Sequence, residues 1–421
     1  MFENQFSVRM AHSLARRISL GLLKRMDGGS LVLVEPDGSR LEFGDPDSDL
    51  RATIEVHDDR FWRAALRASV GLGEAYRDDL WDTDDPVALT RIGARNMPAL
   101  DRWRRRFRPL LWVLDRTVRR VPRNRRRAAR RHISAHYDMG NDLFALFLDE
   151  RMMYSSGVFP YPGASLSEAQ EARLRRVCDS LELKPEDHLL EIGTGWGGLA
   201  EFAASNYGCR VTTTTISQEQ RDGALARVAE AGVSDRVEVL LEDYRDLTGT
   251  YDKLVSLEMI EAVGWQYFDT YFRRCSELLE DDGLFFLQAI VCDDRVYELE
   301  KASKSFASAL IFPGGCLPSV EVIQRCTARV TDMATVWMDD ISEHYSETLR
   351  HWRERFVANA GTAASLGYDK SFRRLWTLWL AMSEGGFRER RIRDVQMLFS
   401  KPGRRPQLGI PAEAEAEPVR A

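Results

Sequence analysis

Residues 189–204, LLEIGTGWGGLAEFAA, decide the fold expected for the rest of this chain. An apolar run typical of a buried strand ends at Glu191, a glycine-rich turn follows, and an apolar helix comes after it. The turn contains four glycines, Gly193, Gly195, Gly197 and Gly198. Glycine is needed there because the backbone must bend tightly and come within contact distance of a cofactor. The stretch therefore predicts a strand, a turn and a helix that bind a nucleotide-like molecule.

Two features of this stretch favour S-adenosylmethionine over NAD, although the turn also fits the G-x-G-x-x-G pattern of dinucleotide-binding proteins. Glu191 suits the amino group and sulfonium charge of S-adenosylmethionine, whereas a carboxylate there would repel a pyrophosphate. About 20 residues further on, where NAD-binding enzymes carry a ribose-binding acid, the sequence reads CRVTTTTIS (209–217). We therefore predict S-adenosylmethionine as the cofactor, held by Gly193, Thr194, Gly195, Trp196 and Gly197 together with Glu191.

Short apolar runs that alternate with helical stretches predict a larger domain over residues 130–402. The runs are DHLLEIG (187–193), CRVTTTTI (209–216), VEVLLED (237–243), YDKLVSLEM (251–259) and GLFFLQAIV (283–291). Such alternation is typical of an α/β fold with a doubly wound, mostly parallel sheet. The tail at 404–421, rich in Pro, Ala and Glu, is expected to be disordered.

Residues 1–125 predict a smaller α+β domain. LVLVEPDGSRLEFG (31–44) is typical of a hairpin around a Pro-Asp-Gly turn, RATIEV (51–56) of a strand, and FWRAALRASVGLGEAY (61–76) of a helix. Because none of these segments has catalytic spacing, we expect an accessory domain that serves as a scaffold or recruits lipid.

The net charge of −6 is unevenly distributed, because residues 101–132 carry fourteen arginines against two aspartates. Arginines interleaved with apolar residues indicate a basic amphipathic helix on anionic lipid headgroups rather than a nucleic-acid site. The alternative is a solvated linker that packs on the neighbouring domain. No apolar run approaches the roughly 18 residues of a membrane-spanning helix, and no secretory signal is recognisable. We expect a cytoplasmic enzyme, peripheral to the inner face of the membrane.

The six cysteines show no C-x-x-C spacing and the histidines are dispersed, so no metal site is predicted.

Seven segments together resemble one family, the cyclopropane-fatty-acyl-phospholipid synthases and mycolic acid cyclopropane synthases. They are HYDMGNDLFALFLDERMMYSSGVF (136–159), TTISQEQ (214–220), EDYRDL (242–247), SLEMIEAVG (256–264), IFPGGCLPS (311–319), HYSETLRHWRERF (344–356) and GFRERRIRDVQMLFSKPG (386–403). The resemblance covers nearly the whole chain. It implies methyl transfer from S-adenosylmethionine to the double bond of an unsaturated phospholipid acyl chain, and it is compatible with a homodimer.

The resemblance also implies further cofactor contacts, at Tyr154, Ser155, Thr215, Ile216, Ser217, Gln220, Asp243, Tyr244 and Arg245. Ser217 and Gln220 can bind ribose hydroxyls, and Tyr244 can stack on adenine. The alternative for Ser217 and Gln220 is a helix N-cap followed by a surface amide.

Methyl transfer to an alkene leaves a carbocation, so the site should be dry, lined with aromatic rings and able to remove a proton. The candidate aromatic residues are Tyr137, Phe144, Phe159, Trp265 and Tyr345. In the family a bicarbonate ion is the base. The resemblance assigns its binding to Glu261, Tyr345 and the backbone of Ile290. The alternative for Glu261 is a buried carboxylate paired with an arginine.

Four positions depart from the family pattern. Ser156 replaces a cysteine and Gln288 replaces a histidine, although both can still donate hydrogen bonds to an anion. Ala262 replaces a histidine. Ser383 replaces a cysteine, and the loss of this thiol argues against covalent catalysis.

These departures leave two products open. Loss of a proton from the new methyl group closes a cyclopropane, whereas a hydride shift followed by proton loss gives a methylene or methyl-branched chain. The segment at about 293–345 is expected to cover the acyl chain. Two other readings remain: a methyltransferase of a small-molecule amine or hydroxyl, and a non-catalytic lipid-binding paralogue.

Overall fold

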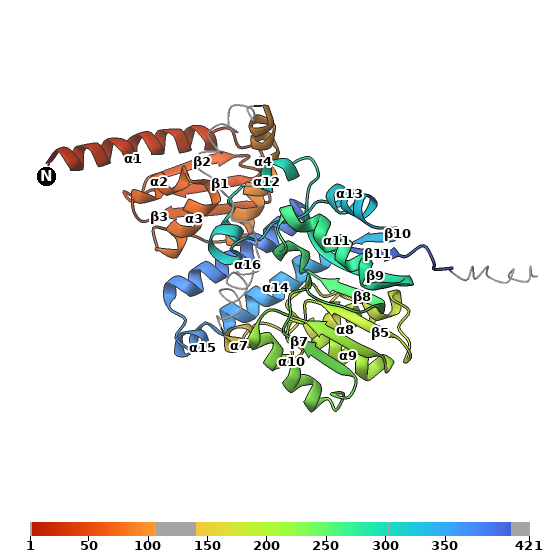
Figure 1. Ribbon diagram of the computed structural model, residues 1–421. Helices are drawn as coiled ribbons and strands as arrows, with labels where there is room; N and C mark the ends of the chain where they lie inside the picture. Colours follow the sequence, from red (N-terminus) through yellow and green to blue (C-terminus); the bar gives the residue numbers. More distant parts are fainter. Residues whose placement is uncertain (1, 107–139, 302, 406–421) are drawn as a thin grey trace, which may run out of the picture.

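A computed structural model describes residues 2–106, 140–301 and 303–405 of the chain, and within them it forms two sheets (Figure 1). The amino-terminal part contains α1 (Phe2–Leu23), β1 (Ser30–Val34), β2 (Arg40–Gly44), β3 (Arg51–Val56), α2 (Arg60–Ala65), α3 (Ala68–Arg77), β4 (Trp81–Thr83) and α4 (Pro86–Arg106).

The larger part begins with α7 (Asn141–Ala145), α8 (Leu166–Ser180), β5 (His188–Ile192), α9 (Gly198–Tyr207), β6 (Arg210–Thr214), α10 (Gln218–Glu230), β7 (Val237–Leu240) and β8 (Tyr251–Leu257). It continues with the 3₁₀ turns η1 (Ile260–Ala262) and η2 (Trp265–Tyr267), α11 (Phe268–Glu277), β9 (Leu279–Cys292), α12 (Tyr297–Glu300) and the π-helical turn η3 (Ala307–Ile311). The last elements are α13 (Val320–Val330), β10 (Ala334–Asp340), α14 (Ser342–Ala358), α15 (Ala360–Ser365), α16 (Lys370–Arg388) and β11 (Ile392–Ser400).

The seven-stranded sheet has the order β10-β11-β9-β8-β5-β6-β7. Strands β9, β8, β5, β6 and β7 pair in parallel, and β11 runs antiparallel between β9 and β10. Four of the apolar runs expected as strands contain β5, β6, β7 and β8, and the fifth run lies within β9. The prediction of a doubly wound, mostly parallel α/β sheet is confirmed.

The direction of winding changes beside β5. From β5 the chain adds β6 and then β7 on one side, and it returns to add β8 on the other side. In a doubly wound sheet this reversal leaves a crevice at the carboxyl ends of the two neighbouring strands, where ligands bind. The segments that begin at this edge are the glycine turn after β5 and residues 258–262 after β8.

The small sheet has the order β2-β1-β3-β4. The expected hairpin forms, with β1 and β2 antiparallel, and β3 pairs in parallel with β1. The helix expected over 61–76 is interrupted, since α2 ends at Ala65 and Ala68 has a φ of +53°. At Gly71 a Cβ would lie 2.0 Å from the carbonyl oxygen of Ala64, so α3 crosses the end of α2 too closely for one straight helix.

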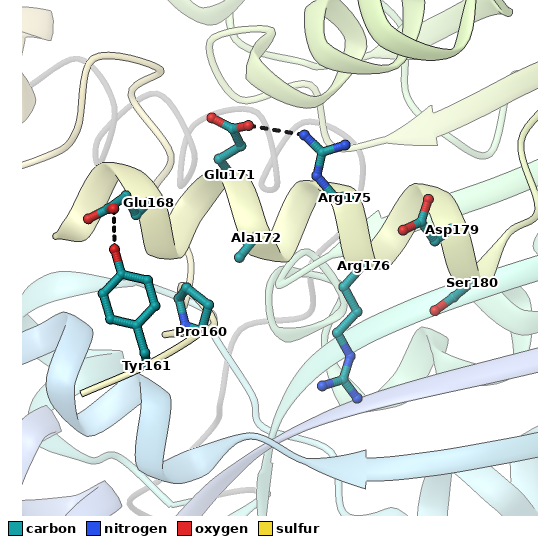
Figure 2. A pocket seen from close by; sticks show the side chains of 9 residues that line it. All are labelled: Pro160, Tyr161, Glu168, Glu171, Ala172, Arg175, Arg176, Asp179 and Ser180. Carbon is teal, nitrogen blue, oxygen red and sulfur yellow. Dashed lines mark hydrogen bonds and ion pairs between the residues drawn. The ribbon is translucent and has the colours of Figure 1, made fainter. Parts of the chain in front are cut away.

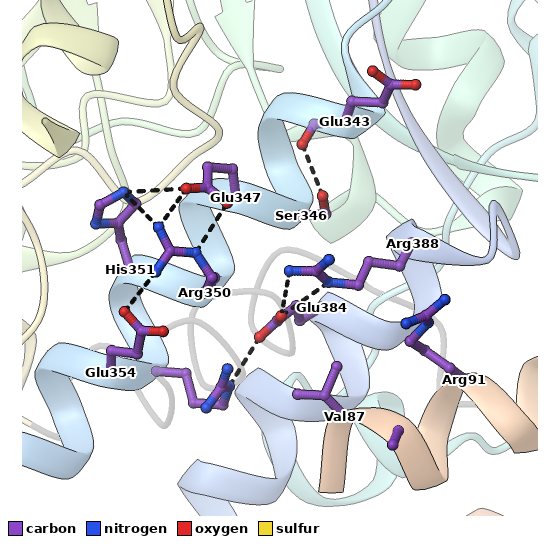
Figure 3. A network of polar contacts seen from close by, with 12 residues as sticks. Val87, Arg91, Glu343, Ser346, Glu347, Arg350, His351, Glu354, Glu384 and Arg388 are labelled. Carbon is purple, nitrogen blue, oxygen red and sulfur yellow. Dashed lines mark hydrogen bonds and ion pairs between the residues drawn. The ribbon is translucent and has the colours of Figure 1, made fainter. Parts of the chain in front are cut away.

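Helix α16 joins the two parts of the structure (Figure 1), and it packs against α3, α4 and α14. Gly385 allows the close approach to α4, because a Cβ there would lie 2.8 Å from Cβ of Thr90. On the other side Glu384 accepts hydrogen bonds from Arg353 of α14 at 2.9 Å and from Arg388 at 3.0 Å (Figure 3). One continuous cluster of apolar side chains runs from β1 through α16 to α14.

Some predictions concern residues outside the described part of the chain. They are the linker between the two expected domains and most of the arginine block, which fall within 107–139, and most of the tail, at 406–421. Within the described part of the block, Arg104 pairs with Asp101 at 3.2 Å and with Glu300 at 3.0 Å. Among the helices described, none is both long and apolar enough to cross a membrane.

Arg374 of α16 tests the attachment of the small sheet. Its guanidinium donates to the carbonyls of Tyr76 at 2.7 Å and Trp81 at 2.8 Å and to Asp82 at 3.0 Å. We expect Arg374→Ala to lower the free energy of unfolding by about 2–3 kcal/mol, because it removes three hydrogen bonds of a largely buried charged group. Lys370→Ala, on the same helix, removes only an exposed pair with Asp79 and should cost less than about 1 kcal/mol. Chemical denaturation measures both, and equal losses would contradict the prediction.

Candidate active site

The glycine turn after β5 has the backbone that its sequence requires. Gly193 has a φ of +109° and Gly197 of +82°, both in a region that side chains with a Cβ rarely adopt. Gly198 begins α9, and a Cβ there would lie 2.3 Å from the sulfur of Met153. The amides of Gly193 and Thr194 donate to the carbonyl of Thr214 at 3.1 and 3.2 Å, so the turn is fixed to the end of β6.

Glu191 lies beneath this turn and is almost completely buried. The hydroxyl of Thr213 donates to its carboxylate at 2.6 Å, and the hydroxyls of Thr213 and Thr194 lie 2.7 Å apart. Burial raises the pKa of Glu191 to about 8, although the Thr213 hydrogen bond and the charge of Arg173 act against the shift. A cation bound beside Glu191 would favour its ionised form. A sulfonium or ammonium group therefore fits this position.

The residues after β6 form a small hydrogen-bonded group. Ser217 is the N-cap of α10, and its hydroxyl accepts from the amide of Gln220. The side-chain oxygen of Gln220 accepts from the Thr215 hydroxyl at 2.8 Å, and Gln220 is buried. The alternative expected from the sequence is therefore correct for Ser217, which caps the helix, and wrong for Gln220, which is not a surface amide. Ile216, between these residues, is partly buried.

The residues after β7 form a charged group against aromatic rings. Asp243 accepts two hydrogen bonds from the guanidinium of Arg245, at 2.7 and 2.6 Å. The same guanidinium lies 5.5 Å from the ring centre of Tyr244. Any adenine that stacks on Tyr244 must therefore use the part of the ring that Arg245 leaves open.

Two further candidate contacts come from the segment before α8 and from the glycine turn. The hydroxyl of Ser155 is buried and has no hydrogen-bond partner in the structure. Trp196 donates from its indole to Asn141 at 2.7 Å and is buried, so its contribution inside the turn is packing.

A second group of polar side chains surrounds Glu258, the first residue after β8. One carboxylate oxygen of Glu258 accepts from the backbone amide of Ser156 at 2.9 Å and from the side-chain amide of Gln288 at 2.7 Å. Its other oxygen accepts from the hydroxyl of Tyr345 at 2.6 Å. We call Glu258 and these three donors the Glu258 cluster. It lies next to the glycine turn, because a Cβ at Gly193 would touch Met259 at 3.3 Å.

The carboxylate at the centre of this cluster differs from the one expected. Sequence resemblance assigned Glu261 to the group that contains Ser156, Gln288 and Tyr345, but the structure joins all three to Glu258. Glu261 instead accepts from the backbone amide of Ile290 at 2.6 Å, and its other oxygen has no hydrogen-bond partner within the described part of the chain. No ion pair between Glu261 and an arginine is found among the described residues. Desolvation and the nearby charge of Glu258 raise the pKa of Glu261 to about 8.

The donors expected to bind bicarbonate are already engaged with the protein. The hydroxyl of Ser156 donates to the carbonyl of Gly157 at 2.9 Å, and its backbone amide donates to Glu258. The side-chain amide of Gln288 donates to both Glu258 and Asp394, and the Tyr345 hydroxyl donates to Glu258. Among the described residues, Ser156, Gln288 and Tyr345 therefore have no donor left for bicarbonate, which would add an anion beside Glu258 and Asp394. These residues therefore do not fit bicarbonate.

One sequence signal could have identified Glu258: it is an acidic residue immediately after a buried strand, at the edge of the sheet where ligands bind. Only the structure shows its φ of +51°, which is strained for a residue with a Cβ. The expectation followed the family pattern, which places the glutamate three residues later. The missed residue Asp394 lies in the middle of β11, where the pattern of the strand alone does not distinguish it.

Aromatic rings form one wall beside the Glu258 cluster. Tyr154 stacks on Trp352 at 5.2 Å and contacts Phe144 at the same distance, and Tyr345 stacks on Phe387 at 4.4 Å. Of the five aromatic candidates, Phe144 and Tyr345 belong to this wall. Phe159 packs instead on His344 and His351, Trp265 lies over Lys301, and Tyr137 falls outside the described residues.

Part of the expected cover lies close to this wall. Phe312 stacks on Tyr154, and the amide of Cys316 donates to the carbonyl of Glu261 at 2.8 Å. The later part of the expected segment is different, because β10 belongs to the sheet and α13 packs against α11. A surface pocket on the outside of α8, lined by Tyr161, Glu168 and Arg175 among others, contains none of the candidate site residues (Figure 2).

Three comparisons agree with this geometry. A model of the family described as mycolic acid cyclopropane synthetase matches residues 124–397. Tuberculostearic acid methyltransferase UfaA1 of Mycobacterium tuberculosis is 37% identical, over 94% of this chain and 92% of that protein. Cyclopropane-fatty-acyl-phospholipid synthase of Escherichia coli is 35% identical, over 83% and 88%. The crystal structure of mycolic acid cyclopropane synthase CmaA1 with SAH and CTAB aligns with a TM-score of 0.61 and 28% identity, over 65% of this chain and 98% of that one.

The strand order, the glycine turn after the first strand of the large sheet and the likeness to CmaA1 define a class I S-adenosylmethionine-dependent methyltransferase. The chain belongs to the mycolic acid cyclopropane synthetase family, whose model matches more than half of it. It is a C-methyltransferase that uses S-adenosylmethionine as methyl donor, related to enzymes that methylate or cyclopropanate unsaturated lipid chains.

The raised pKa of Glu191 predicts how stability depends on pH. Below about 4.5, its ordinary pKa, the carboxyl is protonated in both states; between 4.5 and about 8 only the unfolded chain releases the proton. The wild-type free energy of unfolding should therefore fall through this range relative to Glu191→Gln, by up to about 1.4 kcal/mol per pH unit. Above about 8 the difference should stay constant. Urea unfolding from about pH 5 to about pH 9 measures it.

The control for this measurement is Glu219→Gln, which changes an exposed carboxyl on α10. Its difference from the wild type should show no such slope. A Glu191→Gln difference that is equally flat would contradict the assignment of a buried, protonated Glu191.

Proposed function

We propose that this enzyme transfers a methyl group from S-adenosylmethionine to the double bond of an unsaturated acyl chain of a phospholipid. The product is a cyclopropane or a methylene chain, the latter a precursor of a methyl branch. The observation that carries the proposal is the convergence of the glycine turn over Glu191 with the Glu258 cluster and its aromatic wall. The similarity to UfaA1 and to the E. coli synthase, over most of each protein, supports the lipid substrate.

S-adenosylmethionine supplies a methyl group made electrophilic by the sulfonium charge. We propose that Glu191 and the unpartnered hydroxyl of Ser155 bind its methionine part. Ser217 and Gln220 would then bind the ribose, and Tyr244 would stack on the adenine. The hydroxyl of Ser217 can still donate to a ribose, because it accepts rather than donates at the helix cap. The remaining proposed contacts are Tyr154, Gly193, Thr194, Gly195, Trp196, Gly197, Thr215, Ile216, Asp243 and Arg245.

An alkene is a weak nucleophile, and its methylation leaves positive charge on the chain. Tyr154 and Tyr345 present aromatic rings beside the Glu258 cluster, and the negative faces of such rings stabilise a cation. We propose that Phe312 and the turn at 312–316 cover the acyl chain, because they contact Tyr154 and the backbone of Glu261. Water would capture the cation, so this cover should be essential for a clean product.

Lipid analysis with a labelled donor tests the proposed reaction. Purified enzyme, vesicles of an unsaturated phospholipid and S-adenosylmethionine with a trideuterated methyl group should give labelled acyl chains, detected by mass spectrometry. Two deuteriums should remain when a ring closes or a methylene forms, because the third is lost from the transferred carbon. Proton NMR of the product made with unlabelled S-adenosylmethionine then distinguishes cyclopropane from vinylidene hydrogens. Three retained deuteriums would exclude ring closure. Label in the headgroup, or none in the lipid, would contradict the proposal.

We also propose that the arginine block brings the enzyme to anionic lipid. Each arginine near such a surface contributes about 1 kcal/mol to the free energy of membrane binding. Replacing five arginines by glutamine should therefore weaken the affinity for anionic vesicles on the order of a thousandfold at low salt. Vesicle sedimentation measures this affinity. The positions are Arg125, Arg126, Arg127, Arg130 and Arg131.

A matched control makes the same change in charge at five exposed arginines elsewhere. They are Arg60, Arg175, Arg295, Arg325 and Arg390. The control should retain most of its vesicle binding. An equal loss in both variants would show that net charge, rather than the arginine block, drives the association.

A further inference from the structure

Glu258 occupies the position of an anion within the active site. Three donors from three different segments point to its carboxylate: the Ser156 amide before α8, Gln288 in β9 and Tyr345 in α14. Gln288 is held in this orientation, because its side-chain oxygen accepts from Gln396 at 3.0 Å while its nitrogen donates to both Glu258 and Asp394. The protein therefore supplies, from its own chain, the anion that this set of donors would otherwise bind.

We propose that the carboxylate of Glu258 is the base of the methyl transfer, and that the enzyme works without bicarbonate. This inference rests on the proposed function. In the first step the methyl carbon bonds to one alkene carbon while its bond to sulfur breaks, and the other alkene carbon becomes cationic. For ring closure, a C–H bond of the new methyl group then breaks. Its electron pair forms the second ring bond, and its proton goes to Glu258.

The carboxylate of Glu258 can also take the proton when the product is a methylene chain. A hydride moves from the methylated carbon to the cationic one, and the charge moves to the methylated carbon. A C–H bond of the methyl group then breaks, its electron pair forms the new double bond, and Glu258 takes the proton. In both routes Glu258 gains one proton per turnover and returns it to water before the next.

The carboxylate has room for this proton. A carboxylate offers about four lone-pair positions, and the three donors leave one of them open, on the oxygen that faces Tyr345. Glu258 is also only partly covered by protein, as are its neighbours Met259, Glu261 and Ile290. A hydrocarbon chain beside the aromatic wall can therefore approach it. Asp394 is completely buried, and its approach to the site is blocked by Gln288.

The surrounding charges also favour a protein base over a diffusible one. Glu258 shares its surroundings with Glu261, Asp394 and a single buried arginine, Arg173. A second anion would bring further repulsion to a site that already has more carboxyl groups than cations. Desolvation raises the pKa of Glu258, so the group that takes the proton is a stronger base than an exposed glutamate.

The first experiment measures bicarbonate binding and does not depend on turnover. Carbon-13 bicarbonate is titrated into the wild type and into Glu258→Gly, and binding is followed by NMR line broadening. Glycine suits position 258 because the backbone there has a φ of +51°. We expect no binding by the wild type. Glu258→Gly frees the donors of Ser156, Gln288 and Tyr345 and should bind bicarbonate at millimolar concentration.

The second experiment measures methyl transfer in buffer freed of carbon dioxide, with and without added bicarbonate. The wild type should be equally active in both. Glu258→Gln keeps the shape but cannot take a proton, and its kcat should fall at least about 100-fold without rescue by bicarbonate. Glu258→Gly should be as inactive alone and should regain at least tenfold with bicarbonate. Glu219→Gln, on the surface of α10, should behave like the wild type.

Calorimetry with S-adenosylhomocysteine shows whether each variant is folded and still binds the cofactor product. Bicarbonate binding by the wild type, or a wild-type rate that falls on its removal and returns with it, would overturn the inference. So would a Glu258→Gln enzyme that keeps its kcat. A wild type that binds S-adenosylhomocysteine and methylates no lipid would instead refute the proposed function. That result would also refute the role of Glu258 as base. The first experiment would still show whether the Glu258 carboxylate occupies the position in which bicarbonate would bind.

Discussion

The site depends on the confinement of several carboxyl groups around one arginine. Glu191, Glu258, Glu261 and Asp394 all have raised pKa values, chiefly because they are desolvated, and Arg173 lies completely buried among them. Apart from a hydrogen bond to Gln170, the guanidinium acts through charge, since its two terminal nitrogens have no hydrogen-bond partner among the residues that the structure describes. Buried charges of one sign cannot all ionise without compensation. A cationic methyl donor therefore completes an arrangement that the protein alone leaves short of positive charge.

The fold creates this confinement by bringing distant parts of the chain to one edge of the sheet. Glu191 lies near the end of β5, Glu258 follows β8, and Gln288 of β9 donates a hydrogen bond to Asp394 of β11. Helix α8 contributes Arg173 and α14 contributes Tyr345, so two of the central groups come from helices that cover the sheet. The reversal of winding beside β5 opens the edge at which these elements meet.

The large sheet and the glycine turn could be predicted from the sequence because their signals are local. Strand β9 contains the continuous apolar run LFFL (284–287), and the turn needs its glycines for backbone reasons alone. The Glu258 cluster could not be predicted in the same way. Ser156 contributes its backbone amide rather than its hydroxyl, and Ser217 uses its hydroxyl to cap a helix; such choices depend on where neighbouring segments place competing acceptors. The assignment of Glu261 followed a family pattern that this chain modifies at several adjoining positions, and residue type alone does not show that Glu258 takes over the donors.

Helix α16 has a consequence for the evolution of the chain. The CmaA1 structure is matched over almost its full length by 65% of this protein, so the remainder has no counterpart there. Here one side of α16 is covered by α3 and α4, which Arg374 and Gly385 contact, and the apolar cluster that includes α16 continues into β1. Loss of the amino-terminal unit by truncation or proteolysis would expose an apolar, aggregation-prone surface on the catalytic unit. A homologue without the amino-terminal unit therefore needs a polar outer side on this helix or another cover for it.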